Sequence, residues 1–439
     1  MTIRAAIAGL LLAPVAAFAG PSIERVTTPG GLEAWLVEER AIPMVAIEIS
    51  FAGGASLDPA EEAGAAQFLA AMLEEGAGDL DAVAFSEAAQ ALGARFGFSA
   101  SRDSFSVSAR VLVENLDESI DLLRLALAEP RFDDAPLARV RAQTIAGIRR
   151  GATDPNTQAS LAFFAEAFPD DAYGRPVAGF EETVATIDAA RLTAAWERHL
   201  NRDAAVIGVV GAVDAETLAP LLERLFDALP AAERPALPAV EPALAGGVTV
   251  IDLDAPQSTV MFGHAGLLRD DPDFIAAFVM NHILGGGGFS SRLMTEVRQN
   301  RGLAYSTYAY LLPLDRAGLT VGGVGTANER VAESISVIRD EWRRMAEDGP
   351  TEEELDSAIR FLTGAYALRF DSNAAVARAL VGLQRDDLGI DYIARRNDLV
   401  AAVTVDDVRQ VAARVLDPDA LHFVVVGQPE GLADTPIVQ

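Results

Sequence analysis

Two segments of equal length, about 216 residues apart, carry the same order of structural patterns. They are DAARLTAAWERHLNRDAAVIGVVG (188–211) and TVDDVRQVAARVLDPDALHFVVVG (404–427). Each reads as an amphipathic helix, a short turn and a buried strand that ends in glycine, at Gly211 or Gly427. Because this repeat is far longer than the units of a solenoid, it indicates two copies of one domain in the chain.

A proline-rich stretch separates the two copies. Its prolines are Pro230, Pro235, Pro238 and Pro242. Such spacing is typical of a stiff, extended spacer, and a chain of 439 residues is long enough for two domains. We therefore predict a linker at 229–247 between an N-terminal domain (20–228) and a C-terminal domain (248–439).

Each predicted domain contains strands and helices grouped in runs. The first half has an alternating apolar strand at 45–51, a helix at 61–75 and two strands within 96–111, and the second half has a strand at 259–267, a helix at 271–284 and two strands within 303–325. Alternation at 45–51 is typical of a half-buried strand. Because strands and helices do not alternate one by one, we predict an α+β fold with mostly antiparallel sheets and helices packed on them.

The composition restricts the classes of partner. The formal net charge is −29, and all 35 basic residues are arginine. A chain this acidic is unlike proteins that bind nucleic acid or anionic lipid, because those proteins bind through basic patches. It would favour cationic peptides, although solubility is the commoner reason for such charge. An apolar fraction of one half excludes general disorder.

The N-terminus has the pattern of a secretory signal peptide. Residues 1–19 contain one arginine and an apolar run, and they end in the small-x-small site Ala17-Phe18-Ala19. We expect cleavage after Ala19 and a periplasmic location. No later segment approaches the roughly 20 apolar residues of a membrane span, so we expect no membrane insertion. Cysteine is absent, which excludes disulfides and thiolate metal sites.

The segment GAAQFLAAMLEEG (64–76) resembles the zinc-binding helix of the pitrilysin and processing-peptidase family, the inverzincins. That family carries H-x-x-E-H, which places two histidine ligands and a general-base glutamate on one helix. The matching frame residues are Gly64, Phe68, Leu69, Met72 and Leu73. The three functional positions hold Gln67, Ala70 and Ala71 instead, so the resemblance implies a helix that cannot bind zinc.

The other residues that could bind a metal ion are also missing or wrongly spaced. The family's third ligand is a glutamate on a later helix, and the stretch AGIRRGATDP (146–155) has Gly147 at that position. The four histidines of the chain are His199, His264, His282 and His422, and no two of them have the i, i+4 spacing of a helical metal site. We expect no metal or other cofactor in this chain. The alternatives are a misaligned alanine-rich helix and a relocated metal site.

The second family signature is retained in SSRLMTEVRQNRGLAY (290–305). A helix at about 290–300 would carry Arg298, Gly302 would cap it, and Tyr305 would begin the next strand. The resemblance implies that Arg298 and Tyr305 bind the scissile carbonyl and its oxyanion. The alternative is a surface ion pair for Arg298 and core packing for Tyr305. Tyr308 and Tyr310 fall on the opposite strand face from Tyr305, and we predict that they are packing residues.

A glycine-rich run precedes this helix. It comprises Gly285, Gly286, Gly287, Gly288 and Phe289. Such a run lets the backbone approach a ligand closely, and related processing peptidases use a glycine-rich segment in substrate contact. A helix cap followed by a loop is the equal alternative. His264 and His282 lie in apolar surroundings, and we predict structural roles for them.

The resemblance implies a pair of related domains that face each other across a chamber, as in a clamshell. It implies a non-catalytic subunit that pairs with a homologous zinc subunit carrying H-x-x-E-H and acts on peptides. Zinc is then expected in that partner. The alternative is a scaffold or peptide-binding protein with no role in hydrolysis.

Overall fold

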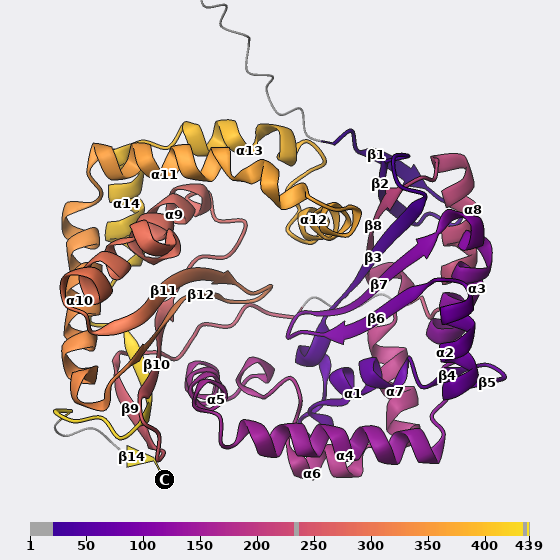
Figure 1. The fold of residues 1–439 in the computed structure, drawn as a ribbon, viewed down its shortest axis with the longest axis horizontal. Coiled ribbons are helices and arrows are strands. Elements are labelled where there is room, and N and C mark those ends of the chain that lie inside the picture. Colours follow the sequence, from indigo (N-terminus) through magenta and orange to yellow (C-terminus); the bar gives the residue numbers. More distant parts are fainter. Residues whose placement is uncertain (1–20, 232–236, 433–436, 439) are drawn as a thin grey trace, which may run out of the picture.

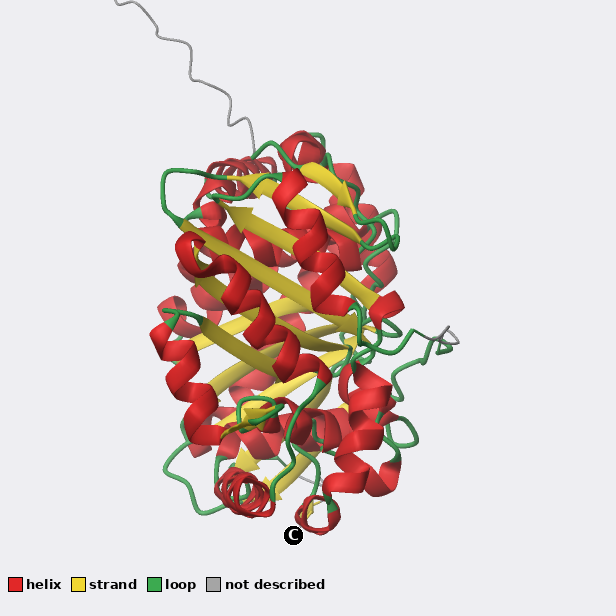
Figure 2. Cartoon of the chain, turned by 90° about the vertical axis from the view of Figure 1, so that its right-hand side faces the viewer, coloured by secondary structure: helices red, strands yellow, loops and turns green. Residues whose placement is uncertain are grey.

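Two six-stranded sheets face each other across the molecule in the computed structural model (Figure 1). The structure describes residues 21–231, 237–432 and 437–438. The predicted signal peptide and part of the predicted linker lie outside these residues. Helices cover the outer faces of the sheets, as the side view shows (Figure 2). The predicted α+β clamshell of two related domains is confirmed.

The N-terminal sheet has the strand order β1-β2-β8-β3-β7-β6. Its strands are β1 (Glu24–Thr27), β2 (Glu33–Glu38), β3 (Met44–Ala52), β6 (Arg95–Ala100), β7 (Ser104–Leu112) and β8 (Ala205–Gly211). Only β2 and β8 pair in parallel. A two-stranded ribbon, β4 (Gly76–Ala77) and β5 (Leu80–Asp81), lies apart from it.

The C-terminal sheet repeats this topology except at one edge, where its last strand pairs in parallel although β1 pairs antiparallel. Its strands are β9 (Gly247–Asp252), β10 (Ser258–Ala265), β11 (Ala304–Pro313), β12 (Gly318–Thr326), β13 (His422–Gly427) and β14 (Ile437–Val438). The repeated segments end in equivalent strands: β8 pairs parallel with β2 and antiparallel with β3, and β13 does the same with β9 and β10. The duplication inferred from sequence therefore extends to strand pairing.

Fourteen α-helices surround the sheets within the described ranges. In the N-terminal half they are α1 (Ala65–Met72), α2 (Ala82–Ala91), α3 (Leu116–Ala128), α4 (Asp134–Gly151), α5 (Pro155–Ala167), α6 (Glu181–Thr186), α7 (Ala189–His199) and α8 (Ala215–Phe226). In the C-terminal half they are α9 (Phe274–Asn281), α10 (Val331–Asp348), α11 (Glu352–Gly364), α12 (Asn373–Arg385), α13 (Tyr392–Ala401) and α14 (Val405–Val415). Each half has its own large apolar core between sheet and helices.

One helix of each half packs on the sheet of the other half. Helix α12 lies on β8 and β3, and helix α5 lies on β10 and β13. The approach of α12 is close: a Cβ added at Gly208 would lie 2.5 Å from the carbonyl oxygen of Ala377. As a result β3 is buried on both faces, including Glu48 and Ser50. The prediction of a half-buried strand was wrong here, because the covering helix comes from the other half.

The hairpin tips of the two sheets also meet. Tyr173 is fully buried between them and donates a hydrogen bond to Asp103 of the first hairpin. Its hydroxyl accepts one from the backbone N–H of Arg316, at 3.1 Å, and Asp103 accepts another from the backbone N–H of Asp315, also at 3.1 Å. These bonds fix the two halves relative to each other at the edge of the chamber.

Candidate functional site

Arg298 and Tyr305 are in contact, as the sequence predicted. Arg298 lies on a π-helical turn, η8 (Met294–Asn300), and Tyr305 is the second residue of β11. Gly302 connects them with φ of +61°, and its N–H donates to the carbonyl oxygen of Arg298 at 2.9 Å. The guanidinium carbon of Arg298 is 4.6 Å from the centre of the Tyr305 ring.

Phe289 completes this site from the glycine-rich run. Its ring centre is 4.7 Å from the Arg298 guanidinium carbon, so the guanidinium contacts two aromatic rings. Both rings are solvent-exposed, Phe289 at 65% and Tyr305 at 80%. Large exposed aromatic rings held against a cation on a folded surface are typical of a binding surface.

The glycines before Phe289 have different surroundings. Gly285 is buried, and a Cβ added there would lie 2.7 Å from the backbone nitrogen of Ala309, so its role is close packing. Gly286 ends the π-helical turn η6 (His282–Gly286), and Gly287 lies beside His282. Gly288 has φ of +57° and open space around it, at the turn that presents Phe289. The run thus combines a helix cap with an exposed turn.

The donor groups of the pair are available. Arg298 has no ion pair or side-chain hydrogen bond with any residue that the structure describes, and the same is true of the Tyr305 hydroxyl. The alternative reading required a surface ion pair for the arginine and core packing for the tyrosine. The geometry has neither feature. A guanidinium and a phenol side by side can both donate to one oxygen atom.

The prediction that Tyr308 and Tyr310 are packing residues was wrong. They are 52% and 42% exposed and stack on each other, with ring centres 6.1 Å apart, whereas Thr307 and Ala309 are buried. The pairing of β11 with β12 shifts register between Ala304 and Thr307. This bulge breaks the strict alternation of faces, so counting residues from Tyr305 gave the wrong face for the later tyrosines.

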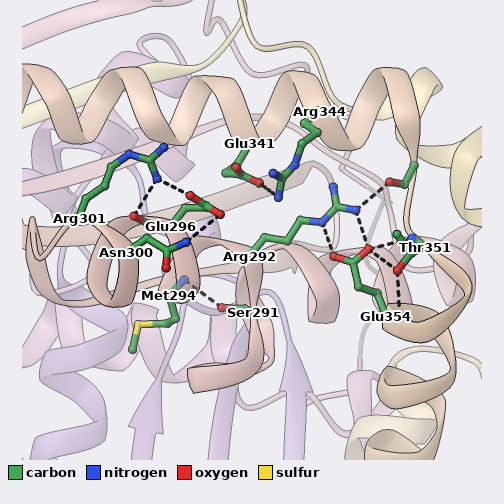
Figure 3. A network of polar contacts seen from close by, with 11 residues as sticks. Ser291, Arg292, Met294, Glu296, Asn300, Arg301, Glu341, Arg344, Thr351 and Glu354 are labelled. Carbon is green, nitrogen blue, oxygen red and sulfur yellow. Dashed lines mark hydrogen bonds and ion pairs between the residues drawn. The ribbon is translucent and has the colours of Figure 1, made fainter.

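A polar network holds the segment that carries Arg298 (Figure 3). The buried Arg292 forms two hydrogen bonds of 2.7 Å with the carboxylate of Glu354 and a third, of 2.8 Å, with the carbonyl oxygen of Gly349. Glu354 also accepts from the backbone N–H of Thr351 at 2.8 Å. Arg292 and Thr351 together lower the pKa of Glu354 to about 2, although burial opposes them.

The outer end of the same segment has its own ion pair. Arg301 pairs with Glu296, which also accepts a hydrogen bond of 3.2 Å from Asn300 (Figure 3). The hydrogen bond from Arg301 lowers the pKa of Glu296. The two networks hold the segment before and after Arg298. Arg298 itself lies between them and is half-exposed to solvent.

The degenerate zinc positions lie on α1 and α4, which pack against each other. Gln67 is half-buried, Ala70 is buried and Ala71 is exposed on α1, while Gly147 is half-buried on α4. These four positions offer one side-chain amide and no imidazole, thiolate or carboxylate. They do not fit a zinc ion, whose protein ligands are nitrogen, sulfur and carboxylate oxygen.

A buried acid–histidine contact fixes the start of α1. Asp58 accepts a hydrogen bond of 3.1 Å from the N–H of Ala66, and His199 Nε2 lies 2.9 Å from its other oxygen. This pair could not be predicted from the sequence, because 141 residues separate its members and neither has a local motif. The contact connects the repeated helix α7 to the degenerate helix.

Two other histidines have the structural roles that were predicted. His264 is buried and accepts a hydrogen bond of 3.0 Å from the indole N–H of Trp342. His282 stacks on Phe361 with ring centres 5.1 Å apart. Burial lowers the pKa of both imidazoles. Across the described ranges no three His, Cys, Asp or Glu side chains are grouped closely enough to share a metal ion.

Fold and site define a two-domain clamshell of the zinc-peptidase type whose metal helix has lost its ligands. Family profiles agree with this class. The profile "Insulinase (Peptidase family M16)" matches residues 35–180, and "Peptidase M16 inactive domain" matches residues 186–362. The chain belongs to the M16 peptidase family, and it is an inactive member of that family.

Several relatives span most of the chain. An uncharacterized zinc protease of Mycobacterium bovis is 30% identical over 404 residues, which cover 89% of this chain and 90% of that protein. One from Streptomyces coelicolor is 29% identical over 90% of this chain and 87% of its own length. The non-peptidase homolog YmxG of Helicobacter pylori is 27% identical over 76% of this chain and 77% of that protein.

Solved structures share the whole fold. The M16 inactive-domain protein of Pseudomonas fluorescens superposes with a TM-score of 0.87 at 28% identity and covers 95% of this chain and 100% of that one. A protease from Helicobacter pylori has a TM-score of 0.84 at 19% identity, over 92% of this chain and 99% of that one, which is a likeness of fold alone. Among the helices described here, none is both long and apolar enough to cross a membrane.

Proposed function

We propose that this chain is the non-catalytic subunit of an exported heterodimeric zinc peptidase, to which it contributes Arg298 and Tyr305. The observation that carries the proposal is the arginine itself. It is held between the exposed rings of Phe289 and Tyr305, and its donor groups have no acceptor in the described part of the chain. A positioned cation with unused donors is suited to bind an oxygen atom of a peptide.

The pair would act on the carbonyl oxygen of the scissile bond. Arg298 and Tyr305 would donate to this oxygen, and both hydrogen bonds would strengthen as it becomes an oxyanion. Phe289 would keep the guanidinium in place, so little reorganisation accompanies the reaction. Because the contacts are strongest in the transition state, they would raise turnover more than ground-state binding.

The remaining parts of the reaction would come from elsewhere. This chain has no cofactor of its own in the proposal, since Gln67, Ala70, Ala71 and Gly147 do not fit zinc. A homologous subunit with H-x-x-E-H would carry the metal and the general base. Substrates would be peptides or unfolded polypeptides that enter the chamber. A periplasmic location follows from the signal-peptide pattern of residues 1–19, and no nucleic acid or membrane insertion is involved.

The test is purification of the native complex followed by kinetics. A zinc-loaded homologue should co-elute in equal amount. In the assembled peptidase, Arg298→Ala and Tyr305→Phe should each lower kcat about a hundredfold with little change in KM, as for other oxyanion donors. Arg343→Ala removes an exposed arginine of α10 and should leave kcat unchanged. Unchanged turnover in both site variants would overturn the catalytic role.

A scaffold or peptide-binding role is the second candidate. The helix without metal ligands favours it, and the YmxG relative is called a non-peptidase homolog. This candidate is preferred if the chain elutes alone and binds peptides with the same affinity before and after Arg298→Ala.

A further inference from the structure

A large cavity opens beside the exposed face of β11, beyond the Arg298 site. Its volume is about 760 Å³. It is lined by α9, β11, the 3₁₀ turn η10 (Tyr366–Phe370), α12 and α13. The three helices lie in the upper part of the view in Figure 1. All of its lining residues belong to the C-terminal half, and one of the lining helices, α12, also packs on the N-terminal sheet.

The lining of this cavity is basic in a strongly acidic protein. Four arginines and two aspartates line it: Arg269, Arg369, Arg378, Arg396, Asp371 and Asp386. Two of the arginines have carboxylate partners within the chain. Arg269 pairs with Asp386 at 3.3 Å, and Arg378 lies 3.4 Å from Glu48 of β3.

The other two arginines have no carboxylate within ion-pair distance in the described residues. Arg396 is only 5% exposed, and its guanidinium donates to the carbonyl oxygen of Leu362 at 2.8 Å. It lies 4.5 Å from the ring centre of Tyr366, and burial lowers its pKa. The neighbouring Arg369 is exposed. A buried cation without a counter-ion is costly, and a bound anion would remove that cost.

Apolar groups complete the lining. Phe278, Leu368 and Tyr310 face the same space, and Leu368 is 76% exposed. Tyr310 belongs to the exposed face of β11, and Tyr305 lies at the start of the same strand. The five steps along the chain from Tyr305 to Tyr310 span about 17 Å at the rise of a β-strand. An extended peptide on this face would therefore connect the two places.

We propose that the cavity binds a carboxylate on the peptide, next to an apolar side chain, about five residues from the bond held at Arg298. Arg396 and Arg369 bind the carboxylate, and the Phe278–Leu368 wall takes the apolar group. This carboxylate is either the C-terminal one or that of an internal acidic residue. The inference extends the proposed function, since it requires peptides to enter the chamber, but it does not require this chain to take part in hydrolysis.

The experiment measures binding to the isolated mature chain by fluorescence anisotropy. One pair of labelled ten-residue peptides is identical except for a C-terminal acid or amide. A second pair is amidated and differs by an internal glutamate or glutamine. In at least one pair the charged peptide should bind about tenfold more tightly, the usual effect of one charge-assisted contact, and salt should reduce the difference.

Two outcomes separate the sources, and a third contradicts both. A preference within the first pair alone identifies the C-terminal carboxylate, and one within the second pair alone identifies an acidic side chain. Equal binding within both pairs overturns the proposal, and this result needs no variant protein. If the preference exists but Arg298→Ala and Tyr305→Phe both leave turnover of the assembled peptidase unchanged, the catalytic role is lost and the carboxylate site stands.

Variants locate the contact. Arg369→Gln should abolish most of the preference for the charged peptide while leaving binding of the neutral peptide intact, and Arg396→Gln should do the same. Arg360→Gln is the matched control, because it removes an exposed arginine of α11 that does not line the cavity. A preference that survives Arg369→Gln and Arg396→Gln in a chain with an unchanged melting temperature would also overturn the assignment.

Discussion

Two arginines six residues apart show how differently one residue type is used in this chain. Arg292 is buried, and three hydrogen bonds join it to Glu354 and Gly349. Arg298 is half-exposed, contacts two rings and has no ion pair in the described structure. The first arrangement stabilises the fold, whereas the second keeps donors available for a ligand.

Their effects on stability should differ accordingly. Arg298→Ala should change the free energy of unfolding by at most about 1 kcal/mol, the size of exposed cation–π contacts. Arg292→Ala leaves Glu354 partly buried without its partner and should destabilise the chain by about 3 kcal/mol. Urea unfolding of the three proteins measures both values. Equal destabilisation by the two substitutions would make Arg298 a structural residue.

At the scale of an element, the start of α11 depends on the same carboxylate. Thr351 and Glu354 form a capping box, in which each side chain accepts from the backbone N–H of the other residue. Arg292 of the preceding segment adds its two bonds to Glu354. Arg292 thus connects the end of α10, where it binds Gly349, and the start of α11 to the segment that carries Arg298.

This cap predicts a pH dependence. The pKa of Glu354 falls from an ordinary 4.5 to about 2 on folding, so its contribution to stability is complete above about pH 5 and is lost as the pH falls toward 2. Glu354→Gln should lower stability at pH 7 and reduce the loss between pH 5 and pH 2. Urea unfolding as a function of pH measures this, with Glu353→Gln, exposed and outside the ion pair, as control. Parallel pH profiles for wild type and Glu354→Gln would contradict the prediction.

At the scale of the whole molecule, the exchange of α5 and α12 joins the halves. The side of the N-terminal sheet that faces the other half buries Trp35 and Val210 against Ala377 and Leu380 of α12 (Figure 1). In the same way Phe163 of α5 is fully buried against the C-terminal sheet. Each sheet therefore lacks part of its apolar cover when its own half is considered alone.

We predict that the halves do not fold independently. Residues 21–228 and 248–439, produced separately, should unfold without a cooperative transition because an apolar sheet face is left in water. The same fragments produced together should form a 1:1 complex with a cooperative transition. Circular dichroism melting and size-exclusion chromatography test this. A cooperative transition in either isolated half would contradict it.

Much of the fold could be predicted from the sequence, and so could the contact between Arg298 and Tyr305. Alternating and helical periodicity gave the strands and helices, and the repeat of 188–211 at 404–427 gave the duplicated sheet. Arg298 and Tyr305 were predicted to meet because a short turn joins a helix end to a strand start. The loss of metal ligands was visible because residue identity alone decides whether a side chain can bind zinc.

Tertiary structure decided the rest. Burial of both faces of β3, the Asp58–His199 contact and the arginine-lined cavity bring together residues more than a hundred positions apart, and no local pattern encodes such partners. The bulge in β11 turned Tyr308 and Tyr310 outward, because the pairing with β12 sets which side of the strand each residue takes. Periodicity indicates which face of a strand or helix is apolar, but only the tertiary structure determines which element covers that face.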